Sequence, residues 1–501
     1  MRLLWIWPLA IWLAGQALWA QSPERLELEQ AMLRLELNRA TVLSFKIPES
    51  KYRGYYQSHI LFLRYLLQED AQLLQAFLDH SKRTLDAVQA MSESDPERGL
   101  LAAELFFLRG VVKAMDKKNV GSAFEMKNAC TLLHRNSQRF PHNIAQMKLL
   151  GTFNVLISVL PTKLKWLGEV LCFSGNLQLG LNQLETAAAK SKLLPQEASV
   201  MLFYFEKNLL GRPDAAVKRA QRLMAASPQS LAATYLLLSG YLETRQIDAA
   251  ISLVQTHEGR LMGNPEVEKL PVWYYSRGKA HFFRLEYEEC IRQMDKFLSA
   301  YSGKTLYADA LYKKAMSQVL MGDYEASRPV FHRLTQAEGS DFDTDEYALS
   351  QAAIYLLRAP SAIEKELYAA RNLFDGGYYL RSIRTLLALQ KRAGKLGEND
   401  RCELLYRFGR NWQELDSLRL ARQCYLGCIS TQPQRNLWMK AYAHYYLGRL
   451  EEGEQHFDLA RNHYLIALGF DNYDYQAGLE QRCKAALEQL NVKKQPAASG
   501  S

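Results

Sequence analysis

Residues 405–433 read LYRFGRNWQELDSLRLARQCYLGCISTQP, and this stretch carries the pattern that decides the fold. It reads as a helix, a short turn and a second helix. Gly409 stands where the two helices must pass close together, and the small residue Ala421 follows twelve residues later. Tyr425 fills the space beside them, and Pro433 closes the second helix because proline cannot continue it. The stretch therefore predicts a helical hairpin whose helices meet at small residues.

The same skeleton recurs along the chain. A small residue marks the point where the second helix of each unit meets the first, at Gly180, Ala216, Ala250, Cys290, Ser327, Ser382, Ala421 and Ala460. Four residues later comes the side chain that fills the gap, at Leu184, Ala220, Val254, Met294, Phe331, Leu386, Tyr425 and Tyr464. The spacing between units is 34 to 40 residues, with one gap of 55. This register is typical of the tetratricopeptide repeat, a helix–turn–helix unit of 34 residues.

One such unit cannot bury its apolar face alone, so the stacking of neighbours forms the core. We therefore expect an all-α fold: a right-handed α-solenoid of tetratricopeptide-like repeats over 160–490, preceded by an irregular helical region over 21–159. The polar tail over 491–501 is expected to be disordered. The gap of 55 residues predicts an insertion made of an acidic loop over 338–346 and an additional helix over 347–358.

The N-terminal region carries clear helix signals but no legible repeat. Residues 22–90 have helical periodicity with one break at 47–50. Asp95 followed by Pro96 predicts a helix start, because a capping residue precedes a proline suited to the first turn. Residues 100–112 and 123–133 then read as a pair of helices.

The first twenty residues read MRLLWIWPLAIWLAGQALWA. Arg2 supplies a positive start, an apolar core follows, and Ala20 is a small residue suited to cleavage. Pro8 and Gln16 interrupt the apolar run, which makes it a poor membrane span. We expect a cleaved signal peptide and an exported chain, most simply in a bacterial periplasm; secretion, or anchoring by an uncleaved N-terminal segment, is the alternative.

The composition is that of a globular protein, with 48% hydrophobic and 23% charged residues. The net charge of +9 is spread thinly, which indicates a solvated basic surface rather than a nucleic-acid site. The seven cysteines are an odd number without paired spacing, at Cys130, Cys172, Cys290, Cys402, Cys424, Cys428 and Cys483. Cys424 and Cys428 are one helical turn apart, about 5–6 Å between Cβ atoms, too far for an easy bridge. Most of the seven are expected to be small buried apolar residues.

Two segments go beyond generic repeats. LPTKL at 160–164, CFSGN at 172–176 and GLNQL at 180–184 resemble the LP-x-K-L … GFSGD-x-x-x-GL-x-x-L signature of the tetratricopeptide repeat protein 39 family. Cys172 stands in place of the family's glycine and Asn176 in place of its aspartate. The second segment is C-terminal: residues 441–448, 460–464 and 475–487 resemble the ending of the same family. The resemblance extends over about residues 120–490 and implies an all-helical adaptor without chemistry of its own.

The sequence offers little for catalysis or metal binding. Residues 302–305, SGKT, imitate the end of a phosphate-binding loop, but Leu298 stands where that loop needs glycine. The acidic stretch 341–345 alternates carboxylates like a calcium loop, yet Glu346 replaces the required glycine, so a capped helix start is favoured. No histidine is placed at metal-ligand spacing. We expect no enzyme activity, no cofactor and no metal, while a site assembled from distant residues stays open.

One recurring pattern points to binding. On the first helix of several units a tyrosine precedes a basic residue by four positions, in the pairs Tyr275–Lys279, Tyr406–Arg410 and Tyr445–Arg449, and Tyr312 lacks the basic partner. A spacing of four places each pair on one helical face. In tetratricopeptide superhelices this face lines the concave groove, where tyrosine offers contact area and the cation anchors a carboxylate. The alternative is that the tyrosines fill spaces between repeats and the cations are merely solvated.

The sequence thus supports a non-enzymatic scaffold of the cell envelope that binds a segment of another protein in the concave groove, where the cations suit an acidic segment. No nucleic-acid partner and no membrane span of the mature chain are expected. The alternative from another class is a carrier of an apolar or lipid-like ligand, held in a pocket between the N-terminal helices and the first repeats. A wet groove lined by tyrosine and arginine favours the scaffold, and an apolar pocket, or lipid in mass spectra of the purified protein, favours the carrier.

Overall fold

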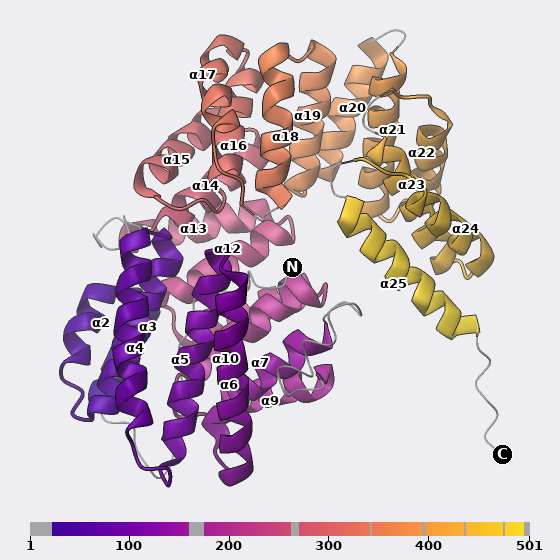
Figure 1. The fold of residues 1–501 in the computed structure, drawn as a ribbon. Coiled ribbons are helices and arrows are strands. Elements are labelled where there is room, and N and C mark those ends of the chain that lie inside the picture. Colours follow the sequence, from indigo (N-terminus) through magenta and orange to yellow (C-terminus); the bar gives the residue numbers. More distant parts are fainter. Residues whose placement is uncertain are drawn as a thin grey trace, which may run out of the picture. The chain divides into compact units, whose positions relative to one another are not determined.

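The computed structural model describes residues 23–159, 175–261, 270–340, 343–392, 396–434, 437–473 and 476–494, and every regular element in these ranges is helical (Figure 1). This confirms the all-α fold of tetratricopeptide-like repeats. Three expected features lie outside the described residues: the signal peptide over 1–20, most of the signature over 160–174, and the end of the tail over 495–501.

The chain divides into two compact units, which we call the first and the second unit. The first contains the residues up to Arg277 together with Lys296–Lys304, and the second contains Gly278–Asp295 and the residues from Thr305 onward. The helices before the division are α1 (Pro23–Leu33), α2 (Leu37–Ser44), α3 (Ser50–Gln68), α4 (Ala71–Gln89), α5 (Pro96–Met115), α6 (Asn119–Arg139), α7 (Met147–Ser158), α9 (Leu177–Lys190), α10 (Pro195–Tyr204), α11 (Pro213–Ala226), α12 (Leu231–Glu243) and α13 (Ile247–Leu261). Short turns of 3-10 helix (Ile144–Gln146) and π-helix (Phe205–Leu209) precede α7 and follow α10.

Helices α14 (Pro271–Arg284) and α15 (Tyr287–Ala300) contribute residues to both units. The second unit continues with α16 (Tyr307–Met321), α17 (Tyr324–Thr335), α18 (Asp343–Leu357), α19 (Ala362–Asp375), α20 (Tyr379–Arg392), α21 (Glu398–Glu414), α22 (Leu418–Ser430), α23 (Trp438–Gly453), α24 (Phe457–Leu468) and α25 (Gln476–Lys494). Consecutive helices pack as hairpins, among them α5 on α6, α21 on α22 and α23 on α24.

The N-terminal helices follow the sequence signals with two additions. The break at 47–50 and the helix start at Pro96 are both confirmed, and the Asp95 side chain accepts a hydrogen bond from the Glu97 amide. Two further breaks were not predicted. They fall at Leu35 and Glu69, which both adopt a left-handed backbone conformation without being glycine. The expected helix pair is α5 and α6.

The repeat register predicted from the sequence is confirmed by burial. All eight small residues of the second helices are buried, and the eight side chains four positions later are at most 4% exposed. The glycines of the first helices also lie at close contacts, where a larger residue would clash. A Cβ atom added to Gly409 would lie 2.6 Å from the Tyr425 ring, and one added to Gly448 would lie 2.6 Å from the Tyr464 ring. These tyrosines therefore occupy the space that each glycine leaves open.

The insertion is present as helix α18, which begins at Asp343, four residues earlier than expected. Its acidic start has a structural role. The buried carboxylate of Asp345 accepts hydrogen bonds from the backbone amides of Leu306 and Asp309, both at 2.8 Å, and so satisfies the N-terminus of α16. Burial raises the pKa of Asp345 to about 6.

Candidate functional site

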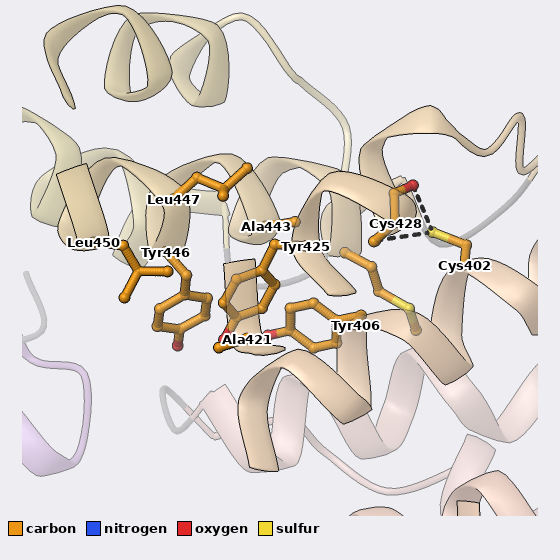
Figure 2. Close-up of a cluster of buried hydrophobic side chains, with 10 residues drawn as sticks. Cys402, Tyr406, Ala421, Tyr425, Cys428, Ala443, Tyr446, Leu447 and Leu450 are labelled. Carbon is orange, nitrogen blue, oxygen red and sulfur yellow. Dashed lines mark hydrogen bonds between the residues drawn. The ribbon is translucent and has the colours of Figure 1, made fainter. Parts of the chain in front are cut away.

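The predicted tyrosines lie mostly in the core. Tyr275, Tyr312 and Tyr406 are 5%, 2% and 5% exposed. The Tyr406 ring lies 6.4 Å from that of Tyr425 and 5.3 Å from that of Trp438, and Figure 2 shows it in the apolar cluster formed by residues of α21, α22 and α23. The geometry of these three rings agrees with the alternative in which tyrosines fill spaces between helices.

Arg410 has the most unusual surroundings of the predicted residues. Its guanidinium carbon lies 4.9 Å from the centre of the Phe374 ring and 4.2 Å from that of Tyr446. These rings come from α19 and α23, the first helices of the neighbouring repeats, while Arg410 itself is on α21. The anion beside it is Glu414, whose carboxylate is 3.5 Å away. Only 16% of the side chain is exposed, and its buried Nε donates no hydrogen bond within the described chain.

The last predicted pair is the most accessible. Tyr445 on α23 is half-buried, with its ring 5.9 Å from that of Tyr464, and Arg449 one turn later is exposed. Burial raises the pKa of Tyr445, so its hydroxyl stays protonated at neutral pH. Lys279 on α14 is half-buried, and its Nζ lies 5.8 Å from the centre of the Phe283 ring. The cations of all three pairs therefore sit beside aromatic rings or in solvent.

The first unit holds an ionic cluster that the sequence did not reveal. The Lys148 ammonium lies 3.0 Å from a carboxylate oxygen of Glu104 and 2.5 Å from one of Glu197. The Tyr55 hydroxyl donates a hydrogen bond to Glu104, and the His59 Nε2 atom is 3.6 Å from Glu197. All five residues are at most 8% exposed.

The donor atoms of His59, Glu104 and Glu197 lie close enough together to hold a metal ion, but the Lys148 ammonium already pairs with both carboxylates. The residues present therefore form an ion-paired core. Burial, assisted by the charge of Lys148, lowers the pKa of His59 to about 4. The sequence signal that was overlooked is Glu104 itself, a carboxylate within the otherwise apolar run LLAAELFFL.

A cavity of about 620 Å³ lies in the first unit, between the N-terminal helices and residues 190–193 at and just beyond the end of α9. This is the position proposed for an apolar ligand, yet the walls are charged. Arg25, Lys51 and Lys192 line it, and the Arg25 guanidinium stacks 4.0 Å from the centre of the Tyr52 ring. Glu49 and Glu97 line it as well, and Lys51 pairs with Glu97, so the charged walls suit polar groups better than hydrocarbon.

The fold and the repeat register define a tetratricopeptide repeat protein. Residues 100–406 match the profile of the Iml2/Tetratricopeptide repeat protein 39 family, and the chain belongs to this family. The resemblance noted in the sequence is thereby confirmed. Repeat families of this kind are generally non-enzymatic interaction scaffolds whose extended surfaces bind other proteins.

The chain is similar to parts of two solved structures. A chain in the crystal structure of the APC/C hetero-tetramer Cut9–Hcn1 is 14% identical, with coverage of 92% of this chain and 96% of that one and a TM-score of 0.30. The tetratricopeptide repeat domain of P58(IPK) is 13% identical, with coverage of 88% and 99% and a TM-score of 0.23. Among the described residues, no helix combines the length and the apolar character that crossing a membrane requires.

Proposed function

We propose that this protein is a non-enzymatic scaffold that binds an acidic segment of another protein across the first helices of its C-terminal repeats. The observation that carries the proposal is the state of Arg410. A guanidinium is charged at all physiological pH values and offers five N–H donors. Here it is largely removed from water, and a buried donor without an acceptor is costly.

A carboxylate from a partner would pair with the part of the Arg410 side chain that stays exposed. Glu414 interacts with one terminal nitrogen at 3.5 Å, a long distance for a charge-assisted hydrogen bond. The rings of Phe374 and Tyr446 hold the guanidinium plane in place, so little side-chain entropy is lost on binding. An incoming carboxylate therefore meets a preorganised cation in a partly desolvated setting.

The pair Tyr445–Arg449 extends this surface by one repeat. Arg449 is exposed and Tyr445 is half-buried, so both can contact a bound segment. Axes of packed helices are about 8–10 Å apart, a span that about three residues of extended chain cover. We therefore expect a partner segment with acidic residues at intervals of about three.

The proposal includes a location. The first twenty residues read as an export signal, which supports a role in the cell envelope, in a bacterial periplasm. Intact mass measurement of the chain recovered from that compartment tests this, since cleavage after Ala20 leaves Gln21 as the first residue. A chain recovered in the cytoplasm with its N-terminus intact would contradict it.

The decisive experiment is a crosslinking pull-down from the native envelope with wild type and Arg410→Met. Methionine keeps the apolar stem and removes the charge, so the fold is expected to persist. The matched control is Arg401→Met on the same helix, because the Arg401 side chain is 58% exposed and pairs only distantly, at 3.8 Å, with Glu398.

We expect one protein to be recovered with wild type and with Arg401→Met and to be lost with Arg410→Met. Its capture should weaken as salt is added, since the anchor is a charge pair. Identical recovery with all three chains, each shown to be folded by circular dichroism, would contradict the site. The carrier of an apolar ligand is not favoured, because the cavity at its expected position has charged walls.

A further inference from the structure

Two cysteines of one repeat lie in direct contact. Cys402 is on α21 and Cys428 is on α22, and their sulfur atoms are 3.4 Å apart (Figure 2). Both side chains are buried, at 1% and 0% exposure, beside Tyr406, Tyr425 and Met439. Both are free thiols in this structure.

The repeat geometry explains the contact. Cys402 precedes Gly409 by seven residues, and Cys428 follows Ala421 by seven. Seven residues are about two helical turns, so each cysteine lies on the same face as its small residue. In two antiparallel helices of one hairpin, these positions lie at the same level. The hairpin geometry therefore brings the two thiols face to face, although they are 26 residues apart in the sequence.

The surroundings favour thiolate formation at one of the two. The Lys440 ammonium donates a hydrogen bond at 2.9 Å to the carbonyl of Thr431, whose hydroxyl in turn donates at 2.6 Å to the carbonyl of Cys428. The hydrogen bond with the Cys428 thiol lowers the pKa of Cys402, and Thr431 and Lys440 lower it further against the effect of burial. The same hydrogen bond and burial raise the pKa of Cys428. The directions of these pKa shifts favour Cys402 as the attacking thiol.

We propose that Cys402 and Cys428 are a modification site: they form a reversible disulfide by exchange with an organic disulfide. The Cys402 thiolate attacks one sulfur of the oxidant, the S–S bond of the oxidant breaks, and one thiolate leaves. Cys428 then loses its proton and attacks the Cys402 sulfur of the mixed disulfide, which expels the second thiolate. Two protein thiols are oxidised by two electrons, and the oxidant is reduced to two thiols.

The geometry requires only a small movement. A disulfide bond is about 2.05 Å long, so the sulfurs, now 3.4 Å apart, must approach by about 1.4 Å. Because both thiols are buried, the oxidant enters only when the end of α22 separates briefly from α21. The bridge would then hold the two helices of this repeat together and limit such opening.

The test uses the purified full-length chain and oxidised glutathione as the probe. After incubation, remaining thiols are alkylated and the chain is digested without reduction for mass spectrometry. We expect one pair of linked peptides that contains Cys402 and Cys428, and its release by dithiothreitol. The oxidised chain should melt roughly 5 °C or more above the reduced chain.

Three variants identify the roles. Cys428→Ser should accumulate a mixed disulfide with glutathione at Cys402, because the resolving thiol is absent. Cys402→Ser should show neither bridge nor adduct at Cys428. Cys424→Ser is the control and should keep the bridge, because Cys424 is half-buried and packs against the α19–α20 cluster instead.

The proposal fails if wild type leaves Cys402 and Cys428 alkylated as free thiols while Cys424 acquires glutathione. It fails equally if the linked peptides join either cysteine to Cys424. Both results come from the wild-type chain, so they stand even where a serine variant does not fold.

Discussion

At the residue scale, the ionic cluster around Lys148 makes the stability of the first unit sensitive to the loss of a single buried charge. Two carboxylates share one ammonium in a setting with almost no water, and Tyr55 supplies a further hydrogen bond to Glu104. A buried pair of this kind contributes little net stability compared with apolar residues, but the loss of one partner leaves an uncompensated charge. Lys148 is therefore the residue on which the cluster depends.

Replacement of Lys148 by methionine should lower the free energy of unfolding by about 3–5 kcal/mol, because Glu104 and Glu197 then face each other without a counter-ion. Urea unfolding followed by circular dichroism measures the change. The triple variant with Glu104→Gln and Glu197→Gln should recover most of the loss. Lys127→Met, at an exposed position on α6, should have no effect. Equal effects at Lys148 and Lys127 would show that the cluster is not a stability determinant.

His59 in the same cluster predicts a pH dependence. Its Nδ1 lies 3.1 Å from the Tyr55 carbonyl, and burial lowers its pKa from 6.5 to about 4. Between these values the unfolded chain binds one proton more than the folded chain, so stability is complete above pH 6.5 and is lost as the pH falls towards 4. The contribution amounts to about 3 kcal/mol. In His59→Gln the urea midpoint should vary less over this window than in wild type or in the exposed control His134→Gln. An unchanged slope would rule His59 out as its cause.

The sequence places the binding candidates on first helices of the repeats, but it does not reveal which of their side chains the neighbouring repeats cover. A spacing of four places Tyr406 and Arg410 on one helical face, and both residues lie on one face of α21. Which part of that face is covered depends on how the next repeat packs, and Trp438 of α23 closes over Tyr406. The contact of Cys402 with Cys428 was within reach of the sequence, because both are seven residues from the small residues of the hairpin.

At the scale of the element, the helical hairpin was the most predictable feature. Small residues every 34 to 40 positions mark where helices touch, and that requirement is local to each hairpin. The breaks at Leu35 and Glu69 were not predictable in the same way. Neither residue favours a left-handed backbone, so the packing of the surrounding helices imposes it. The hairpins could be predicted because each is specified by residues within one repeat. The two breaks could not, because they depend on packing against other helices.

The close approach within the α21–α22 hairpin can be tested at Gly409. An added methyl group would lie 2.6 Å from the Tyr425 ring, and overpacking of this kind costs about 1–3 kcal/mol. The better helix propensity of alanine offsets up to about 1 kcal/mol of that. Gly409→Ala should therefore lower the melting temperature, as measured by differential scanning calorimetry. Gly453→Ala is the control, because it lies in a first helix and no atom is within 4 Å of its added Cβ. A melting temperature raised in both variants would mean that the ring moves aside without cost.

At the scale of the whole molecule, a solenoid is stabilised by contacts between neighbours in sequence, and its ends need covering. Helix α25 covers one end. Its residues Leu479, Cys483, Ala486 and Leu490 pack on Ala460, Tyr464 and Ala467, so that the last repeat does not present an apolar face to water. The sequence indicated the repeats themselves but gave no register for this helix, because α25 follows no further hairpin.

Leu479→Asp should uncover this end and show how far stability is transmitted. Leu479 is 1% exposed, so the new charge is buried and α25 detaches from α24. Hydrogen exchange measured by mass spectrometry should show the largest loss of protection in α23 and α24, a smaller loss in α21 and α22, and none in α3 to α6. Gln481→Asp introduces the same charge at an exposed position of the same helix and should change nothing. This graded loss follows from nearest-neighbour coupling in a repeat array. A uniform loss over the second unit would mean instead that its repeats unfold as one cooperative block, and α25 would then be part of a single core rather than a cap.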